Sequence, residues 1–146
     1  MPIKSFRGQL ATSGIETINL HTNNGMIGYR IVKLELMPTS PGKTTYENVF
    51  KIFTIPQTTV TGTIDFSDQT LLAVGYIANN SNNSTNAQSV VVFDNVIINQ
   101  DIDITNIDRD DSATQGVNYH IELEQVKLSL DENTVATLKD IRNITG

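Results

Sequence analysis

Apolar and polar residues alternate with a period of two over much of the chain, a pattern typical of β-strands rather than helices. In the segment 26–37, Val32, Leu34 and Leu36 fall on one face and alternate with charged residues. The segment 59–66 alternates in the same way, with its threonines on one face and its apolar residues on the other. Both segments are predicted to be half-buried strands.

Two further segments, 71–78 and 90–98, are almost continuously apolar. Runs of this length and composition predict strands that are buried on both faces. In the segment 119–124 the alternation is regular again, but it changes phase over 126–130. A change of phase inside one run is typical of a β-bulge or of a bend between two sheets.

Turn-forming residues separate these runs. Asn24-Gly25 stands between two alternating segments and predicts a tight β-hairpin. Pro56 ends the predicted strand 49–55, since proline cannot donate to a strand ladder. The segment 79–88 consists mainly of Asn and Ser and is predicted to be an exposed loop.

Only the end of the chain has a helical pattern. Ser129 and Glu132 stand at capping-box spacing, and apolar residues then recur at helical spacing, which predicts a helix within 129–143. The sequence therefore predicts an all-β fold, with residues 1–146 as one jelly-roll-like β-sandwich domain of about eight to ten strands and a short C-terminal helix. Residues 1–8 are a possible N-terminal arm of this domain.

The residues that many catalytic and metal sites need are scarce. The chain has no Cys and only two histidines, His21 and His120, which are expected at the surface or at strand edges. Disulfide scaffolds, Cys-ligated zinc, iron–sulfur clusters and thiol catalysis are thereby excluded. No apolar run approaches the roughly 20 residues of a membrane helix. We therefore expect a protein that is not an enzyme, has no catalytic or cofactor-binding residues, and has no membrane partner.

The net charge of −6 is unevenly distributed along the chain. Residues 1–60 carry six Lys or Arg and three Asp or Glu, whereas residues 61–146 carry four and 13. This asymmetry either orients the protein on a charged partner or reflects acidic surface loops. An acidic chain is a poor match for nucleic acid, because phosphate contacts need clustered Lys and Arg.

The acidic segment 101–111 is the strongest candidate for an ion site, because calcium prefers several oxygen ligands from one loop. An EF-hand alignment from Asp108 fails, since Ala113 takes the glycine position and Tyr119 the bidentate glutamate position. A different calcium site, or simply a solvated acidic loop, remains open. The candidate ligands are Asp101, Asp103, Asp108, Asp110 and Asp111.

Glu122 and Glu124 lie on the same face of a predicted strand, about 7 Å apart. Such a spacing is compatible with glycoside hydrolysis, but it is also that of any solvent-facing strand. We expect no catalysis there. Binding of sugars on a flat aromatic platform is disfavoured because the chain has no Trp and only 6% aromatic residues.

Four further stretches have a distinctive sequence: 25–33 (GMIGYRIVK), 70–77 (TLLAVGYI), 93–105 (FDNVIINQDIDIT) and 118–143 (NYHIELEQVKLSLDENTVATLKDIRN). They resemble small virion structural proteins of marine tailed phages, the types that infect cyanobacteria and related ocean bacteria (cyanophages and pelagiphages). The resemblance spans nearly the whole chain and is most specific in its closing YHIELEQ and TLKDIRN. It carries no catalytic motif.

In a virion protein the basic N-terminal segment could contact an acidic shell surface. Lys4 and Arg7 flank Phe6, which would serve as an apolar anchor, and these three residues are our interface candidates. The alternatives are a frayed terminus or an ordinary first strand.

The resemblance implies a non-enzymatic capsid decoration or cement protein as the leading hypothesis. It implies a homo-oligomer that binds the major capsid protein or other virion proteins, in the virion and, during assembly, in the bacterial cytoplasm. A tail, connector or fibre-attachment component is the second hypothesis. The third, from a different class, is a lectin-like or calcium-dependent binding module.

Overall fold

The chain folds into two antiparallel β-sheets. The computed structural model describes residues 2–20, 26–41, 45–80, 85–93, 96–110 and 114–128. These ranges contain eight strands, so the predicted all-β fold is confirmed. The predicted hairpin turn at Asn24-Gly25, the predicted helix within 129–143 and His21 lie outside the described residues.

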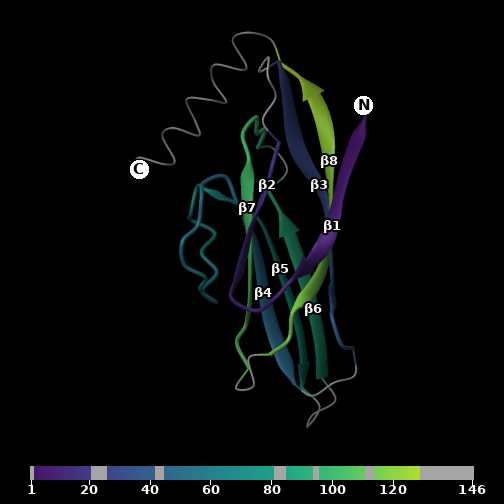
Figure 1. Ribbon diagram of the computed structural model, residues 1–146, viewed down its shortest axis with the longest axis vertical. Coiled ribbons are helices and arrows are strands. Elements are labelled where there is room, and N and C mark those ends of the chain that lie inside the picture. The colour runs from purple at the N-terminus through teal and green to yellow at the C-terminus, as the bar shows by residue number, and fades with distance from the viewer. Residues whose placement is uncertain are drawn as a thin grey trace.

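The smaller sheet has three strands and the larger one has five, and Figure 1 shows them as two layers. The three-stranded sheet has the order β1 (Ile3–Leu10), β8 (Val117–Lys127) and β3 (Ile27–Pro38). The five-stranded sheet has the order β2 (Gly14–Ile18), β7 (Ile102–Asp108), β4 (Tyr46–Phe53), β5 (Leu71–Asn80) and β6 (Thr85–Val92).

The core lies between the two sheets, in a β-sandwich-like arrangement. Alternate residues of each strand point inward, as the period-two pattern predicts. Phe50 of β4 and Tyr119 of β8 contact each other across the layers, with ring centroids 5.6 Å apart. Ile104 and Ile121 are fully buried on the same inner faces. The run 71–78 becomes β5, and its apolar residues are buried on both faces of the sheet as predicted.

Strands that are far apart in the sequence form most of the pairs. The first strand pairs with the last, β2 pairs with β7, and β4 pairs with β5. Of the two remaining strands, β3 pairs with β8, and β6 pairs with β5 and also contacts β3 of the other sheet. Successive strands β1, β2, β3 and β4 alternate between the two sheets.

A β-bulge in β3 places one residue on a different face of the strand from the one predicted. Ile31 is opposite Leu123 and Lys33 is opposite Glu122, so Val32 is an extra residue without a partner in β8. The bulge shifts the alternation by one position. Val32 is therefore 41% exposed, and the prediction that it shares the buried face of Leu34 was wrong.

The predicted strand over 59–66 is also wrong. The segment 54–70 between β4 and β5 contains no strand, and Phe66 is 56% exposed. In Figure 1 this blue-to-teal segment lies on the side of the five-stranded sheet away from the three-stranded sheet. It covers the outer face of β4, where Lys51 and Phe53 are buried. We call the segment 54–70 the covering loop.

The predicted strand over 90–98 is displaced toward the N-terminus. It is β6, which begins at Thr85 within the predicted loop 79–88 and ends at Val92. Ile98 is nevertheless buried, because it forms an isolated antiparallel bridge with Tyr29 of β3. The apolar character of this segment therefore reflects burial by two different elements rather than one continuous strand.

Candidate functional site

The outer face of the three-stranded sheet carries most of its charged side chains. Strand pairing places Arg7 of β1 and Glu35 of β3 on either side of His120 in β8. The next row of this face contains Glu122 opposite Lys33. Because alternate residues of one strand share a face, these side chains form a continuous polar surface across all three strands.

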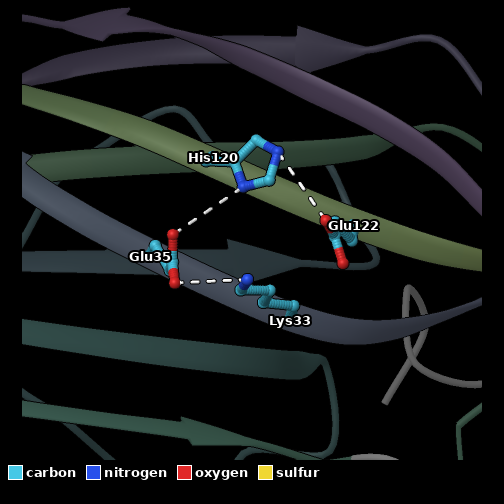
Figure 2. A network of polar contacts seen from close by, with 4 residues as sticks. All are labelled: Lys33, Glu35, His120 and Glu122. Atoms are coloured by element: carbon cyan, nitrogen blue, oxygen red, sulfur yellow. Dashed lines mark ion pairs between the residues drawn. The ribbon is translucent and has the colours of Figure 1, made fainter.

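Figure 2 shows the centre of this surface. The two ring nitrogens of His120 lie 4.0 Å from carboxylate oxygens, Nδ1 from Glu35 Oε2 and Nε2 from Glu122 Oε1. Lys33 Nζ lies 3.3 Å from Glu35 Oε1. A protonated His120 would thus stand between two carboxylates, at distances longer than a hydrogen bond. These four side chains, Lys33, Glu35, His120 and Glu122, are named the charged cluster.

A groove of about 750 Å³ opens beside the charged cluster. It combines charged side chains with an apolar contribution from Met37, which is 61% exposed. Gln88 of β6 contributes a wall from the other sheet. The groove is lined by Arg7, Gly8, Gln9, Glu35, Leu36, Met37, Gln88, Asn118, Tyr119 and His120.

The carboxylates of Glu122 and Glu124 share this face, as the alternation predicted. Glu124 Oε2 accepts a hydrogen bond of 2.8 Å from Arg30 Nη2, and Glu122 belongs to the charged cluster. Both side chains are partly exposed on an open sheet rather than enclosed in a cleft. Their arrangement is suited to surface contacts between charged groups, which are weak individually and specific in combination.

The acidic segment 101–111 mostly forms strand β7, not a loop. Asp103 accepts hydrogen bonds from the Thr17 hydroxyl at 2.7 Å and from the Gln57 backbone N–H at 2.8 Å. Asp101 accepts one from the Leu20 backbone N–H at 2.8 Å. These carboxylates therefore hold an edge strand and two loops against β7.

Asp108 and Asp110 serve similar structural roles at the other end of β7. Asp108 is 2% exposed, and its carboxylate accepts hydrogen bonds from the backbone N–H groups of Glu47, Asp110 and Gln115. Asp110 Oδ2 accepts a hydrogen bond from the Thr45 hydroxyl. The described ranges contain no group of three or more His, Asp or Glu that could hold a metal ion, and Asp111 lies outside them.

The three N-terminal interface candidates are part of an ordinary edge strand. Residues 3–8 belong to β1 and pair with β8, so they do not form a separate arm. Phe6 packs against the core. Lys4 Nζ lies 5.5 Å from the Phe6 ring centroid and 5.7 Å from that of Tyr29, which keeps its charge on the inner side of the strand. Arg7 alone points outward, where it lines the groove.

The charged cluster was not identified as a site from the sequence. Lys33 with Glu35, and His120 with Glu122, can each be placed on one strand face from alternation alone. Their meeting depends on the pairing of β3 with β8, two strands that lie about 85 positions apart in the sequence. No local motif signals such a pairing.

Comparisons with protein-family models, with curated proteins and with solved structures give no match for this chain. Within the described ranges, no helix is long and apolar enough to cross a membrane.

Proposed function

We propose that this protein is a non-enzymatic structural protein of a virion, and that it decorates or cements the exterior of a capsid. The observation that carries the proposal is the strand order. Pairing of β1 with β8, β2 with β7 and β4 with β5 is what results when a long hairpin ribbon is rolled into two sheets. In such a ribbon β6 would pair with β3; here it contacts β3 but pairs with β5. We infer a jelly-roll-like sandwich, an architecture frequent in viral capsid proteins and lectins.

The resemblance of the sequence 118–143 to phage virion proteins supports the same function. Fold alone does not determine function, since one architecture serves many roles. The two arguments are independent, because the resemblance concerns the amino-acid sequence and the strand order concerns the topology of the fold.

The outer face of the three-stranded sheet is the proposed contact with the shell. The opposite outer face, on the five-stranded sheet, is covered by the loop 54–70. The described residues include no such cover over the charged cluster and its groove. Mixed positive and negative side chains on an uncovered sheet favour a specific partner through charge complementarity.

Quantitative mass spectrometry of purified virions tests the location. A decoration protein is expected in hundreds of copies per particle, on the order of the number of shell subunits, because it follows the shell symmetry. A copy number that matches only a few small rings per particle would instead indicate a tail, connector or fibre-attachment component. Absence from the particle would overturn the proposal.

A substitution in the charged cluster tests the proposed surface. Glu35→Lys reverses one charge, and we expect it to weaken binding to isolated capsids by about tenfold or more. Thr58→Lys introduces a lysine at an exposed position of the covering loop and is the matched control. Equal binding by both variants would show that the three-stranded face is not the contact.

A further inference from the structure

A second cavity, of about 200 Å³, lies on the opposite side of the molecule between the covering loop and the five-stranded sheet. Its floor is formed by strands β4, β5 and β7, and its outer wall by the loop, which Figure 1 shows beside the sheet. The lining residues are Lys51, Phe53, Leu71 and Thr105 from the strands and Gln57, Thr59, Thr61, Thr63, Asp65 and Asp68 from the loop.

The covering loop is fixed to the sheet at several points. The Gln57 backbone N–H donates to Asp103 Oδ2 of β7, and the Thr54 backbone N–H donates to the Thr70 carbonyl at 2.9 Å, which closes the two ends of the loop on each other. Lys51 Nζ donates to Thr61 Oγ1 at 3.2 Å and to the Thr63 carbonyl at 2.9 Å. The cavity is therefore preformed, which lowers the entropy that a ligand loses on binding.

Lys51 is the central polar group of this cavity. The residue is only 6% exposed, and burial lowers the pKa of its ammonium while the nearby Asp68 carboxylate raises it. An ammonium group has three N–H donors; Lys51 Nζ uses two of them for the loop and also lies 5.6 Å from the centroid of the Phe53 ring. An aromatic ring is a weaker acceptor than an oxygen atom, so a hydroxyl oxygen in the cavity would stabilise this group further.

Asp65 and Asp68 supply acceptors at the rim. Asp65 Oδ1 accepts two hydrogen bonds from Ser67, which lower the pKa of its carboxyl, and Asp68 Oδ1 accepts two from Thr70. In both residues these bonds are made to Oδ1. Two carboxylates beside one ammonium disfavour an anion, and the ammonium disfavours a metal cation.

The remaining walls are suited to a neutral ligand with many hydroxyl groups. Four threonines line the cavity, and each hydroxyl can both donate and accept. Thr105 is 1% exposed, and its Oγ1 has no hydrogen-bond partner. Phe53 and Leu71 add apolar surface of the kind that the C–H groups of a sugar ring contact.

We propose that this cavity binds one small polyhydroxylated molecule, such as a single sugar ring. Its volume is below the roughly 300–1,000 Å³ of pockets for drug-sized ligands, so it holds one ring and not an oligosaccharide. Lys51 and the threonines bind the hydroxyl groups, and Phe53 contacts the ring. This inference does not rest on the proposed virion function.

Two-dimensional NMR of the ¹⁵N-labelled full chain tests the proposal. D-Glucose, D-galactose and D-mannose are each titrated to about 100 mM, since a site of this size is expected to bind with a Kd of about 1–10 mM. For at least one sugar we expect saturable shifts confined to amides of the covering loop, Lys51 and Thr105. No saturable shift with any of the three sugars would overturn the proposal, as would stronger shifts of the same amides with glycine or inorganic phosphate.

Variants separate the site from the general surface. Lys51→Met and Thr61→Val should each weaken sugar binding about tenfold, the effect of one lost hydrogen bond to a polar ligand. Lys127→Met removes an exposed lysine on the other sheet, outside the charged cluster, and should leave the Kd unchanged. Circular dichroism establishes that each variant is folded. Equal Kd values for Lys51→Met, Thr61→Val and the unaltered protein would refute the assignment.

Discussion

The Tyr119 hydroxyl on β8 donates a hydrogen bond of 3.2 Å to Glu16 Oε1 on β2, and this contact joins the two sheets. Tyr119 is 5% exposed and its ring also contacts Phe50. Burial, together with the charge and the hydrogen bond of Glu16, raises the pKa of Tyr119 to about 12. The free energy of unfolding should therefore fall as the pH rises through the alkaline range.

Tyr119→Phe should make the protein less sensitive to alkali. In the unfolded chain the phenol loses its proton near its usual pKa of 10.0, whereas in the folded protein it keeps it to about 12. The stabilisation is thus complete below pH 10 and is lost as the pH rises from about 10 to 12. At neutral pH the variant should be about 1 kcal/mol less stable, the value of one hydrogen bond.

Urea denaturation at about pH 8 and about pH 11 measures this difference. The gap between the two proteins should narrow at the higher pH. Tyr46 and Tyr76 are present in both proteins, so their own titration cancels in the comparison. A gap that stays constant would contradict the assigned role of Tyr119.

Gly75→Ala should destabilise the protein by about 1–3 kcal/mol, the usual cost of overpacking a core. Gly75 of β5 lies on the inner face of its sheet, opposite Leu36 of β3. A Cβ atom at Gly75 would clash with Leu36 Cδ1 and lie 3.2 Å from its Cγ. Leu36 is buried, so relief of the clash requires a change of its rotamer or a separation of the sheets.

A double substitution separates packing from backbone effects. Leu36→Ala alone leaves a cavity, and Gly75→Ala in that background should cost less than in the unaltered protein because the clashing methyl is gone. Thermal denaturation of the two single variants and the double variant gives the interaction energy. Strict additivity would mean that the contact between these two residues does not limit how closely the sheets pack.

Alternation in the sequence was sufficient to predict the inner faces of several strands. Leu34, Leu36, Tyr119 and Ile121 are all buried between the sheets as expected. It failed at Val32 because a bulge adds a residue without changing the composition of the strand. The period of two identifies a strand, but it does not show where the pairing shifts.

The segment 59–66 shows a different limit. The pattern predicts that the apolar residues face the sheet, but Thr61 and Thr63 supply the acceptors for buried Lys51, and Ile64 and Phe66 are 41% and 56% exposed. Thr59, Thr61 and Thr63 are themselves exposed, so neither face of the segment is enclosed. Alternation does not predict a buried strand where the neighbouring sheet surface is polar and needs hydrogen-bond acceptors.

Asn106→Asp should destabilise the protein more than Asn106→Ala at neutral pH. Asn106 is fully buried, its Oδ1 accepts a hydrogen bond from Asn48 Nδ2, and its Nδ2 donates to the Leu10 carbonyl at 3.1 Å. A carboxylate cannot donate to that carbonyl, and an unpaired buried charge costs several kcal/mol, about 3–5. The alanine variant loses the hydrogen bonds but adds no charge, at about 1–3 kcal/mol.

Lowering the pH should reduce the difference in stability between the Asn106→Asp and Asn106→Ala variants. Burial raises the pKa of an unpaired carboxyl, and a protonated carboxyl can again donate to Leu10. Urea denaturation of the two variants at about pH 7 and about pH 4 follows the order of their stabilities. If Asn106→Asp is as stable as the unaltered protein at neutral pH, the hydrogen bond to Leu10 is not required.

Calcium should leave the melting temperature unchanged. A ligand that binds only the folded state raises stability by mass action, so a calcium site would shift the transition by several degrees at about 100 times its Kd. The carboxylates of Asp101, Asp103 and Asp108 already accept hydrogen bonds from backbone N–H groups that calcium would have to displace. Thermal denaturation with calcium, with magnesium and with a chelator compares these conditions. A rise specific to calcium, abolished by Asp101→Asn, would mean that this segment rearranges to bind the ion, at the expense of the contacts that hold β2 and the covering loop against β7.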